Sequence, residues 1–348
     1  MSENKPFLNV LNNRKEQSIP FWFMRQAGRY LPEYRKLRAE KGGFLDMAMD
    51  PETACEITMQ PLRRFGMDAA IIFSDILVVP MALGCKLEFT VGEGPKLDPV
   101  QSGQDILALD PAGLETLDFV YEALQKTRNA FVQEGFDRTA LIGFAGAPWT
   151  VATYMIEGGS SRDFFKSKTL AYQNPQWFTE LIKILTHATA QYLIKQIEAG
   201  AEAVQVFDSW SGVLDSDQFD KWVIGPTRDI VVHIRKVYPH TPIIGFPKGA
   251  GYNFLSYVRE TGVSAIGLDS HVPTAWAAEE LQSLKPVQGN LDPACLLAGG
   301  DALISGTRQI IQNFRNGPFI FNLGHGIHKE TPVEHVEILV RTIRNFPS

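Results

Sequence analysis

The sequence predicts an α/β fold, a (β/α)8 TIM barrel, in a single domain covering residues 1–348. Three observations indicate this fold. Eight short apolar runs recur along the chain, each run ends in glycine or polar residues, and amphipathic helical patterns lie between the runs. Buried strands that alternate with helices form a parallel sheet covered by helices. Eight such units favour a sheet that closes into a barrel.

The eight apolar runs are expected to be buried strands, because they lack the polar alternation of a half-exposed strand. In chain order they are Pro20–Met24, Ala69–Phe73, Leu141–Phe144, Ala203–Phe207, Pro242–Phe246, Ala265–Leu268, Pro286–Gln288 and Phe319–Leu323. A doubly wound open sheet is the alternative. It is disfavoured because no run is followed by a G-x-G-x-x-G or phosphate-loop motif.

Three segments between the runs have apolar residues at helical spacing. They contain Leu114, Leu117, Tyr121 and Leu124; Leu181, Ile184, Leu185 and Ala188; and, after the start signal Thr331-Pro332, Val333, Val336, Val340 and Ile343. Residues 86–97 break the alternation, because two short extended segments there flank Gly92-Glu93-Gly94-Pro95. This pattern predicts a small β-hairpin insertion. No linker rich in proline, glycine or serine divides the chain.

Composition excludes several classes of protein. Hydrophobic residues make up 45% and charged residues 21%, which is typical of a globular protein. The net charge of −6 argues against binding of nucleic acid or of an anionic membrane by the surface as a whole. The cysteines Cys55, Cys85 and Cys295 are scattered, which favours a reducing compartment. The polar start, Met1–Lys5, is unlike a signal peptide, so a cytoplasmic protein is expected.

The active-site residues of a barrel lie on the loops that follow the strands. Applied to the eight runs, this rule selects Arg25, Arg29, Asp75, Asp208, Ser209, Lys248, Asp269, Asp292 and His325.

The first of these loops is strongly basic. From Phe21 to Arg38 there are five basic residues and one acidic residue, a local charge of +4. Because the guanidinium group holds carboxylates with two parallel hydrogen bonds, such a loop suits an anion with several charges. A basic face exposed to solvent is the alternative. Gly28, between Arg25 and Arg29, favours the binding site because glycine permits close approach to the backbone.

The positions of four residues, three of them selected by the loop rule, indicate different roles. Asp75 stands between two apolar runs, so it is either a helix N-cap or a buried functional group that would accept from a cation or an N–H donor. Tyr154 lies about one turn into a helix and belongs either to the mouth of the barrel or to the core. His325 stands between two glycines, a placement more typical of function. Ser209 lacks a G-x-S-x-G motif, so a nucleophilic role is disfavoured.

Several segments resemble the uroporphyrinogen decarboxylase family, in the family's order and over residues 6–345. The resembling segments are Phe21-Trp-Phe-Met-Arg25-Gln-Ala-Gly-Arg29-Tyr-Leu-Pro-Glu33, Ile71-Ile-Phe-Ser-Asp75-Ile-Leu77, Tyr154-Met-Ile-Glu-Gly158, Phe207-Asp-Ser209-Trp210, Gly289-Asn-Leu-Asp-Pro293 and Asn322-Leu-Gly-His325-Gly-Ile327. The first block is long enough to be highly specific.

The resemblance implies a (β/α)8 barrel and a homodimer that acts in haem biosynthesis. The implied reaction removes CO2 from the four acetate side chains of uroporphyrinogen III and gives coproporphyrinogen III, with no metal or cofactor. The resemblance also implies that Arg25, Gln26, Ala27, Gly28, Arg29, Asp75, Tyr154, Ser209 and His325 bind the substrate, with Arg38 as a further anion contact.

The chemistry assigns roles to some of these residues. A pyrrole protonated on a ring carbon is an electron sink for the leaving CO2, and a carboxylate that faces the pyrrole N–H groups would stabilise this cation. We expect Asp75 to supply that carboxylate and Arg25 and Arg29 to anchor substrate carboxylates. The proton donor stays open among an arginine, which is a poor acid, Tyr154, His325 and a water held by Arg25.

Three alternative functions remain. A zinc-dependent corrinoid or thiol methyltransferase shares the fold, but it would need a His-x-Cys pair, and Thr53, Leu83 and Pro293 stand two residues before the three cysteines. Lys248 could form a Schiff base, although a lone lysine at a strand end is more often structural or anion-binding. A tetrapyrrole carrier without catalytic activity is the third alternative.

Overall fold

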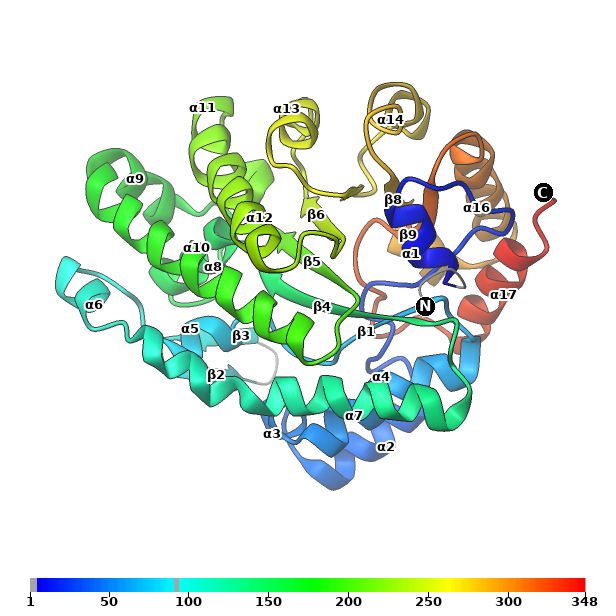
Figure 1. Ribbon diagram of the computed structural model, residues 1–348, viewed down its shortest axis with the longest axis horizontal. Coiled ribbons are helices and arrows are strands. Elements are labelled where there is room, and N and C mark those ends of the chain that lie inside the picture. Colours follow the sequence, from blue (N-terminus) through cyan, green and yellow to red (C-terminus); the bar gives the residue numbers. More distant parts are fainter. Residues whose placement is uncertain (1–4, 91–93, 348) are drawn as a thin grey trace.

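Seven parallel strands form the central sheet of the protein. The computed structural model describes residues 5–90 and 94–347. The strands are β1 (Ala69–Ile71), β4 (Ala140–Gly146), β5 (Ala203–Asp208), β6 (Ile243–Pro247), β7 (Ala265–Gly267), β8 (Val287–Leu291) and β9 (Phe319–Leu323). They pair in the order β1-β4-β5-β6-β7-β8-β9, so each strand lies beside its successor in the sheet. Figure 1 shows the strands in the middle of the molecule with helices around them.

The prediction of eight strands is wrong for the first run, Pro20–Met24. Only Phe21 forms a β-bridge, to Phe321 of β9. On the β9 side Trp22 N donates to Phe321 O (3.3 Å), and on the β1 side Asp68 N donates to Phe21 O (3.0 Å). The Asp68 carboxylate accepts from Phe21 N (3.0 Å), so a side chain takes a donor that a regular ladder would use. The run therefore contacts both neighbours without forming a strand.

The segment predicted as an insertion contains a separate antiparallel pair, β2 (Leu87–Thr90) and β3 (Gly94–Leu97). The turn of the predicted hairpin falls on residues 91–93, which lie outside the described residues, as does most of the polar start of the chain, residues 1–4. The ring of Phe89 in β2 lies 4.9 Å from that of Phe44. The pair therefore lies against the segment that follows the basic loop.

Seventeen α-helices fall within the described residues. They are α1 (Pro6–Leu11), α2 (Pro32–Lys41), α3 (Phe44–Met49), α4 (Pro51–Phe65), α5 (Val78–Ala82), α6 (Gly103–Leu107), α7 (Asp118–Glu134), α8 (Pro148–Glu157), α9 (Phe165–Gln173), α10 (Pro175–Glu198), α11 (Ser216–Phe219), α12 (Gly225–Val237), α13 (Asn253–Glu260), α14 (Thr274–Glu280), α15 (Pro293–Ala298), α16 (Gly300–Phe314) and α17 (Val333–Arg344). Short turns are η1 (Pro111–Leu117), η2 (Ser211–Val213) and the π-helical η3 (Asp220–Ile224). None of the described helices is long and apolar enough to cross a membrane.

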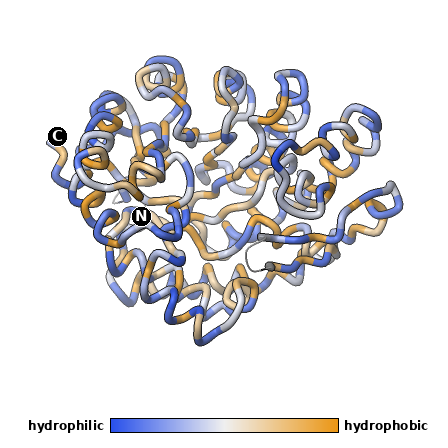
Figure 2. The backbone as a smooth tube through the Cα atoms, turned by 180° about the vertical axis from the view of Figure 1, so that it is seen from behind, coloured by the Kyte–Doolittle hydropathy of each residue, from blue (hydrophilic) through white to orange (hydrophobic). Residues whose placement is uncertain are grey.

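All three predicted amphipathic segments are helical. The first is divided between η1 and α7, the second is α10 and the third is α17. Proline stands in the first turn of several helices, including α8 and α10, where its missing N–H group would have no partner within the helix. The helices turn their apolar faces to the sheet, and Figure 2 shows the hydrophobic colour concentrated along the strands.

Two layers of core result from the alternation of side chains along each strand. One set of residues points to the inside of the curled sheet and packs with Trp22 and Met24 and with Phe7 and Leu11 of α1. This inner set includes Ala69, Ile142, Ala203, Ile244, Phe246 and Ile320. The other set packs against the helices. The inside of the sheet is therefore filled by side chains, as in barrels whose interior is a core.

Arg344 of α17 joins the end of the chain to this sheet. Its guanidinium lies 3.1 Å from the Asp68 carboxylate, donates to Gly66 O (2.9 Å) and stacks 4.5 Å from the Phe21 ring centroid. The Asp68 side chain is only 11% exposed, so the charge of Arg344 compensates a carboxylate that is largely removed from water.

Arg344→Ala is expected to lower the free energy of unfolding by about 1–2 kcal/mol, because it leaves a buried carboxylate with fewer partners. Urea denaturation measures the change. Arg341→Ala is the matched control, since Arg341 is exposed on the same helix and its side chain has no bonded partner among the described residues. Equal stability of the two variants would contradict the role given to Arg344.

Candidate active site

The carboxyl ends of the strands bring together residues from distant parts of the sequence. Asp75 follows β1, Ser209 follows β5, Lys248 follows β6 and His325 follows β9. Arg25 follows the run that lies between β9 and β1. This end of the sheet is where the loop rule places an active site.

Arg25 is held in place by the loop after β9. The Asn322 side chain accepts from Met24 N (3.0 Å), and Ile327 N donates to Met24 O (2.9 Å). Arg25 itself has φ of 57°, a left-handed conformation that is costly for a residue with a side chain. A Cβ atom at Gly326 would overlap the Cγ and Cδ atoms of Arg25. Glycine at position 326 therefore makes room for the Arg25 stem.

Asp75 carries a carboxyl group with an unusual environment. Its Oδ1 accepts from Leu77 N (2.8 Å), which closes a turn before α5, and Leu77 rather than Asp75 is the N-cap of that helix. Burial raises the pKa of Asp75 to about 6, although the Leu77 N–H group and the charge of Arg25 act in the opposite direction. The expectation that Asp75 is a helix N-cap is therefore wrong, and its role as a functional group stays a prediction.

Tyr154 of α8 belongs to the same cluster. Its ring centroid lies 6.4 Å from that of Trp210. Burial raises the pKa of Tyr154, and the charges of Asp75 and Arg25 modify it in opposite directions. Tyr154 is therefore within electrostatic range of both residues, and it is a partly buried residue that packs against the core.

His325 is neutral at physiological pH. Burial holds its pKa down at about 4, and the positive charges of Lys248 and Arg25 add to this effect, while Asp269 opposes it. The imidazole ring has one N–H donor and one acceptor in this state. It can therefore donate a hydrogen bond to an anion without carrying charge.

The rest of the basic loop forms a second cationic edge. Arg29 is exposed and Arg38 is half-buried on α2, and both lie close enough to Tyr34 to lower its pKa, which burial raises. The Tyr34 ring packs 5.9 Å from the ring of Phe73, two residues before Asp75. The two arginines thus flank the segment that leads to Asp75.

Gln26, Ala27 and Gly28 connect Arg25 to Arg29. Gln26 is 1% exposed, and both polar atoms of its amide lack a partner among the described residues. Ala27 and Gly28 are half-buried. A Cβ atom on Gly28 would have only Arg25 O nearby, at 3.7 Å, which is an ordinary contact. Within the protein, it is therefore Gly326 whose lack of a side chain is needed, because the Arg25 side chain packs against it. A side chain at position 28 would meet little else in the protein.

Two residues selected by the loop rule face away from the mouth or cap a helix. Asp208 is buried on the helix side of β5, where its Oδ1 accepts from Thr150 Oγ1 (2.5 Å), and burial raises its pKa to about 7. Asp292 accepts from Ala294 N (2.8 Å) as the N-cap of α15. Neither side chain is placed to contact a ligand at the mouth.

Other residues support the mouth from behind. Thr150 Oγ1 accepts from Trp210 N (3.1 Å), which fixes the backbone beside half-buried Ser209. The Asp269 carboxylate accepts from Gly249 N (2.7 Å), next to Lys248. Sequence reasoning assigned no role to Asn322, Gly326, Thr150 or Trp210. Three of them lie in the segments that carry the family resemblance, and this position in the sequence was the only available signal.

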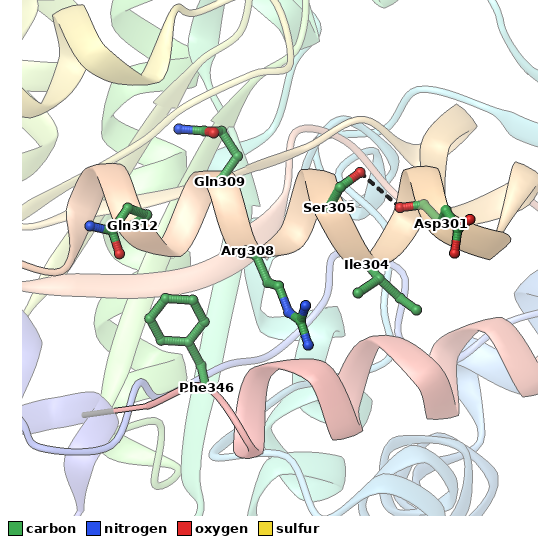
Figure 3. A pocket seen from close by; sticks show the side chains of 7 residues that line it. All are labelled: Asp301, Ile304, Ser305, Arg308, Gln309, Gln312 and Phe346. Carbon is green, nitrogen blue, oxygen red and sulfur yellow. Dashed lines mark hydrogen bonds between the residues drawn. The ribbon is translucent and has the colours of Figure 1, made fainter.

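Two surface hollows lie away from the strand ends. One of about 510 Å³ lies over α16 and is lined by Asp301, Ile304, Ser305, Arg308, Gln309, Gln312 and Phe346 (Figure 3). Another, of about 320 Å³, includes Asp68 and Arg344. Neither contains a residue that follows a strand at its carboxyl end, so we place the site at the strand ends on the chemistry of the side chains there. Residues 5–90 and 94–347 contain no group of three or more His, Cys, Asp or Glu side chains able to hold a metal ion.

Comparison with known proteins identifies relatives that match nearly the whole chain. The family model described as Uroporphyrinogen decarboxylase (URO-D) matches residues 2–346. A uroporphyrinogen decarboxylase of Rhodospirillum rubrum is 52% identical over 341 residues, which cover 98% of this chain and 97% of the relative. One from a Chelativorans species is 51% identical over 345 residues, 99% of each chain.

Among solved structures, a methyltransferase from Methanosarcina mazei aligns with a TM-score of 0.80 over 97% of each chain at 18% identity. At that identity the likeness concerns the fold alone. The match of the family model to nearly the whole chain and the two relatives at about half identity decide the question. The chain is a member of the uroporphyrinogen decarboxylase family.

Proposed function

We propose that the carboxyl ends of the strands bind uroporphyrinogen III and that the residues gathered there remove CO2 from its four acetate side chains. Decarboxylation in porphyrin biosynthesis is the activity of the family to which the chain belongs. The observation that carries the assignment of the site is the Asp75 carboxylate at the end of β1, which lies within electrostatic range of Arg25 and Tyr154.

The reaction needs no resident metal or cofactor because the pyrrole ring supplies the electron sink. A proton adds to the ring carbon next to the acetate-bearing carbon and leaves a cation delocalised over the ring. The bond between the acetate methylene and its carboxylate then breaks, CO2 leaves, and its electron pair neutralises the ring. Protonation of the exocyclic methylene and loss of the ring proton give the methyl group and restore the pyrrole.

Asp75 is suited to the cationic step. Its carboxylate can accept from the pyrrole N–H groups, whose acidity rises when the ring is protonated. A charge fixed in a partly desolvated cleft stabilises such a cation far more than the same charge in water would. Since the carboxylate is already oriented by the Leu77 N–H group, little reorganisation is needed when the cation forms.

The cations of the site bind the carboxylates of the substrate. Arg25 lies beside Asp75, and Arg29 and Arg38 extend the cationic edge along the basic loop. The neutral ring of His325 offers a further donor without adding charge. Binding of carboxylates remote from the reacting acetate positions the ring for the reaction.

The pKa values restrict the choice of proton donor. Arginine does not release its proton in proteins. His325 has already lost its second proton at neutral pH, and burial makes Tyr154 a weaker acid than usual. Because water is itself a weaker acid than a phenol, Tyr154 and a water molecule held by Arg25 both stay candidates for proton delivery.

We extend the proposal to the closure of the barrel, the domain and oligomeric organisation, and the cellular location. The run Pro20–Met24 would close the curled sheet into a barrel, because it is hydrogen-bonded to Phe321 of β9 and to Asp68 beside β1. We propose that the whole chain works as one domain and, on the family resemblance, as a homodimer. A cytoplasmic location is supported by the three free cysteines.

Anaerobic incubation with uroporphyrinogen III tests the function directly. Products with seven, six, five and four carboxylates, separated by chromatography after oxidation, are expected. Binding of uroporphyrinogen without release of CO2 would instead identify a carrier. One tightly bound equivalent of zinc in the purified protein would instead revive the methyltransferase alternative.

Asp75→Asn is expected to lower kcat by about 10²- to 10³-fold, because the amide keeps the shape but not the charge that stabilises the cation. Binding of the substrate is expected to persist. The matched control is Asp301→Asn, in the hollow over α16, which should leave kcat unchanged. Near-normal turnover by the Asp75 variant would remove that carboxylate from the mechanism.

The pH profile should report the ionisation of Asp75. With a pKa of about 6, the group is about 90% charged at pH 7 and about 10% charged at pH 5, so kcat/KM should fall as the pH is lowered through 6. His325 stays neutral over this range because its pKa is about 4. The acidic limb should therefore persist in His325→Gln, and its disappearance in that variant would assign the limb to the histidine.

A further inference from the structure

We propose that Lys248 is a substrate-binding residue, which holds a carboxylate of the tetrapyrrole on the side of the mouth opposite the basic loop. The inference rests on the proposed function and extends it, because the binding residues expected from the resemblance include no lysine. Four observations support it: the face of the strand on which Lys248 lies, the anchoring of its backbone, the position of its ammonium group and its charged neighbours.

Lys248 continues the inward-facing side of β6. Ile244 and Phe246 point to the inside of the curled sheet and pack in the inner core. Because side chains alternate along a strand, Lys248, two residues further on, points the same way at the level where the core ends and the mouth begins. The lysine is half-buried there.

The backbone of Lys248 is fixed on both sides. Its N–H group donates to Asp208 O (3.0 Å), and its carbonyl accepts from Gly212 N (3.1 Å) and from Ser211 Oγ (3.0 Å). The next N–H group, of Gly249, donates to the buried Asp269 carboxylate (2.7 Å). A lysine that served only for solubility would not need this anchoring, whereas a residue that positions a charge benefits from it.

The ammonium group lies against an aromatic wall. Its nitrogen is 5.6 Å from the centroid of the Trp210 ring, and the same ring lies 6.4 Å from that of Tyr154. No carboxylate is paired with the Lys248 ammonium among the residues that the structure describes. Two acidic residues at or after the ends of the neighbouring strands have other contacts: Asp208 accepts from Thr150 on the helix side, and Asp269 accepts from the Gly249 N–H group.

The neighbouring charges favour an anion at this position. Lys248 and Arg25 both lower the pKa of His325, so two positive charges flank one neutral ring. Such an arrangement is relieved by a negative group placed between the cations. A tetrapyrrole with up to eight carboxylates supplies it, and a cation on the β6 side lets the ring be held at opposite edges.

Lys248→Met tests the proposal while retaining most of the length of the side chain. We expect a 10- to 100-fold increase in KM, and in the Kd for the product coproporphyrinogen measured anaerobically, with kcat within about threefold of wild type. Lys248→Arg should recover most of the affinity because it restores the charge. Lys248→Gln provides a second neutral variant if the methionine variant is poorly folded.

Two further measurements separate substrate binding from a structural role. Lys221→Met is the matched control, because Lys221 is an exposed lysine stacked 4.4 Å from the Trp222 ring outside the mouth, and it should change neither KM nor Kd. In Lys248→Met the pKa of His325, followed by NMR, should rise, since one of its positive neighbours is gone.

Unchanged KM and Kd in folded Lys248→Met would overturn the proposal. An unchanged pKa of His325 in Lys248→Met would also contradict the proposal, because it would show that Lys248 does not lie near that ring. Failure of wild type to release CO2 would overturn the proposed activity alone, because the Kd comparison does not depend on turnover.

Discussion

The attachment of the Met24–Arg25 segment to the end of β9 is the constraint on which the site depends. Asn322 and Ile327 hold the backbone of Met24, and Gly326 leaves room for the stem of Arg25, which adopts a left-handed conformation. This attachment joins the start of the chain to the last strand and brings Arg25 within range of Asp75, Tyr154 and His325. Without it, the basic loop would be one more charged surface segment. The strain at Arg25 is offset by the bonds around it, as is common where backbone geometry serves function.

Burial and neighbouring charges determine which residues of the site are charged. Burial and the two nearby cations keep His325 neutral, while burial raises the pKa of Asp75 to a value that still leaves it charged at neutral pH. Under the proposed function, the strand ends present cations for the substrate carboxylates and one anion, Asp75, for the pyrrole nitrogens. The net charge of −6 does not oppose an anionic substrate, because the positive charge is concentrated in the loop with local charge +4 and at Lys248. A cleft of low polarity focuses such a field, while the rest of the surface stays acidic.

The sequence predicts most of the fold and part of the site, and the differences have physical causes. Seven of the eight apolar runs are strands, since a buried parallel strand needs only an uninterrupted apolar segment. Pro20–Met24 has the same composition, but Asp68 takes one of its N–H donors and the chain turns at Arg25, and neither event is visible in the local pattern. The loop rule selected Asp75, Ser209, Lys248 and His325, which the structure places after strands, and also Asp208, which alternation along β5 turns toward the helices. The roles of Asn322 and Gly326 depend on contacts across some 300 residues of sequence, so no local pattern could have assigned them.

The central claim is that the strand ends hold the tetrapyrrole with its nitrogens toward Asp75 and its carboxylates toward the surrounding cations. A crystal structure with coproporphyrinogen bound under anaerobic conditions tests it most directly. We expect pyrrole N–H groups within hydrogen-bonding distance of the Asp75 carboxylate, about 2.7–3.2 Å, with substrate carboxylates at Arg25 and Lys248. A tetrapyrrole bound elsewhere, for example over α16, or one whose nitrogens face away from Asp75, would contradict it.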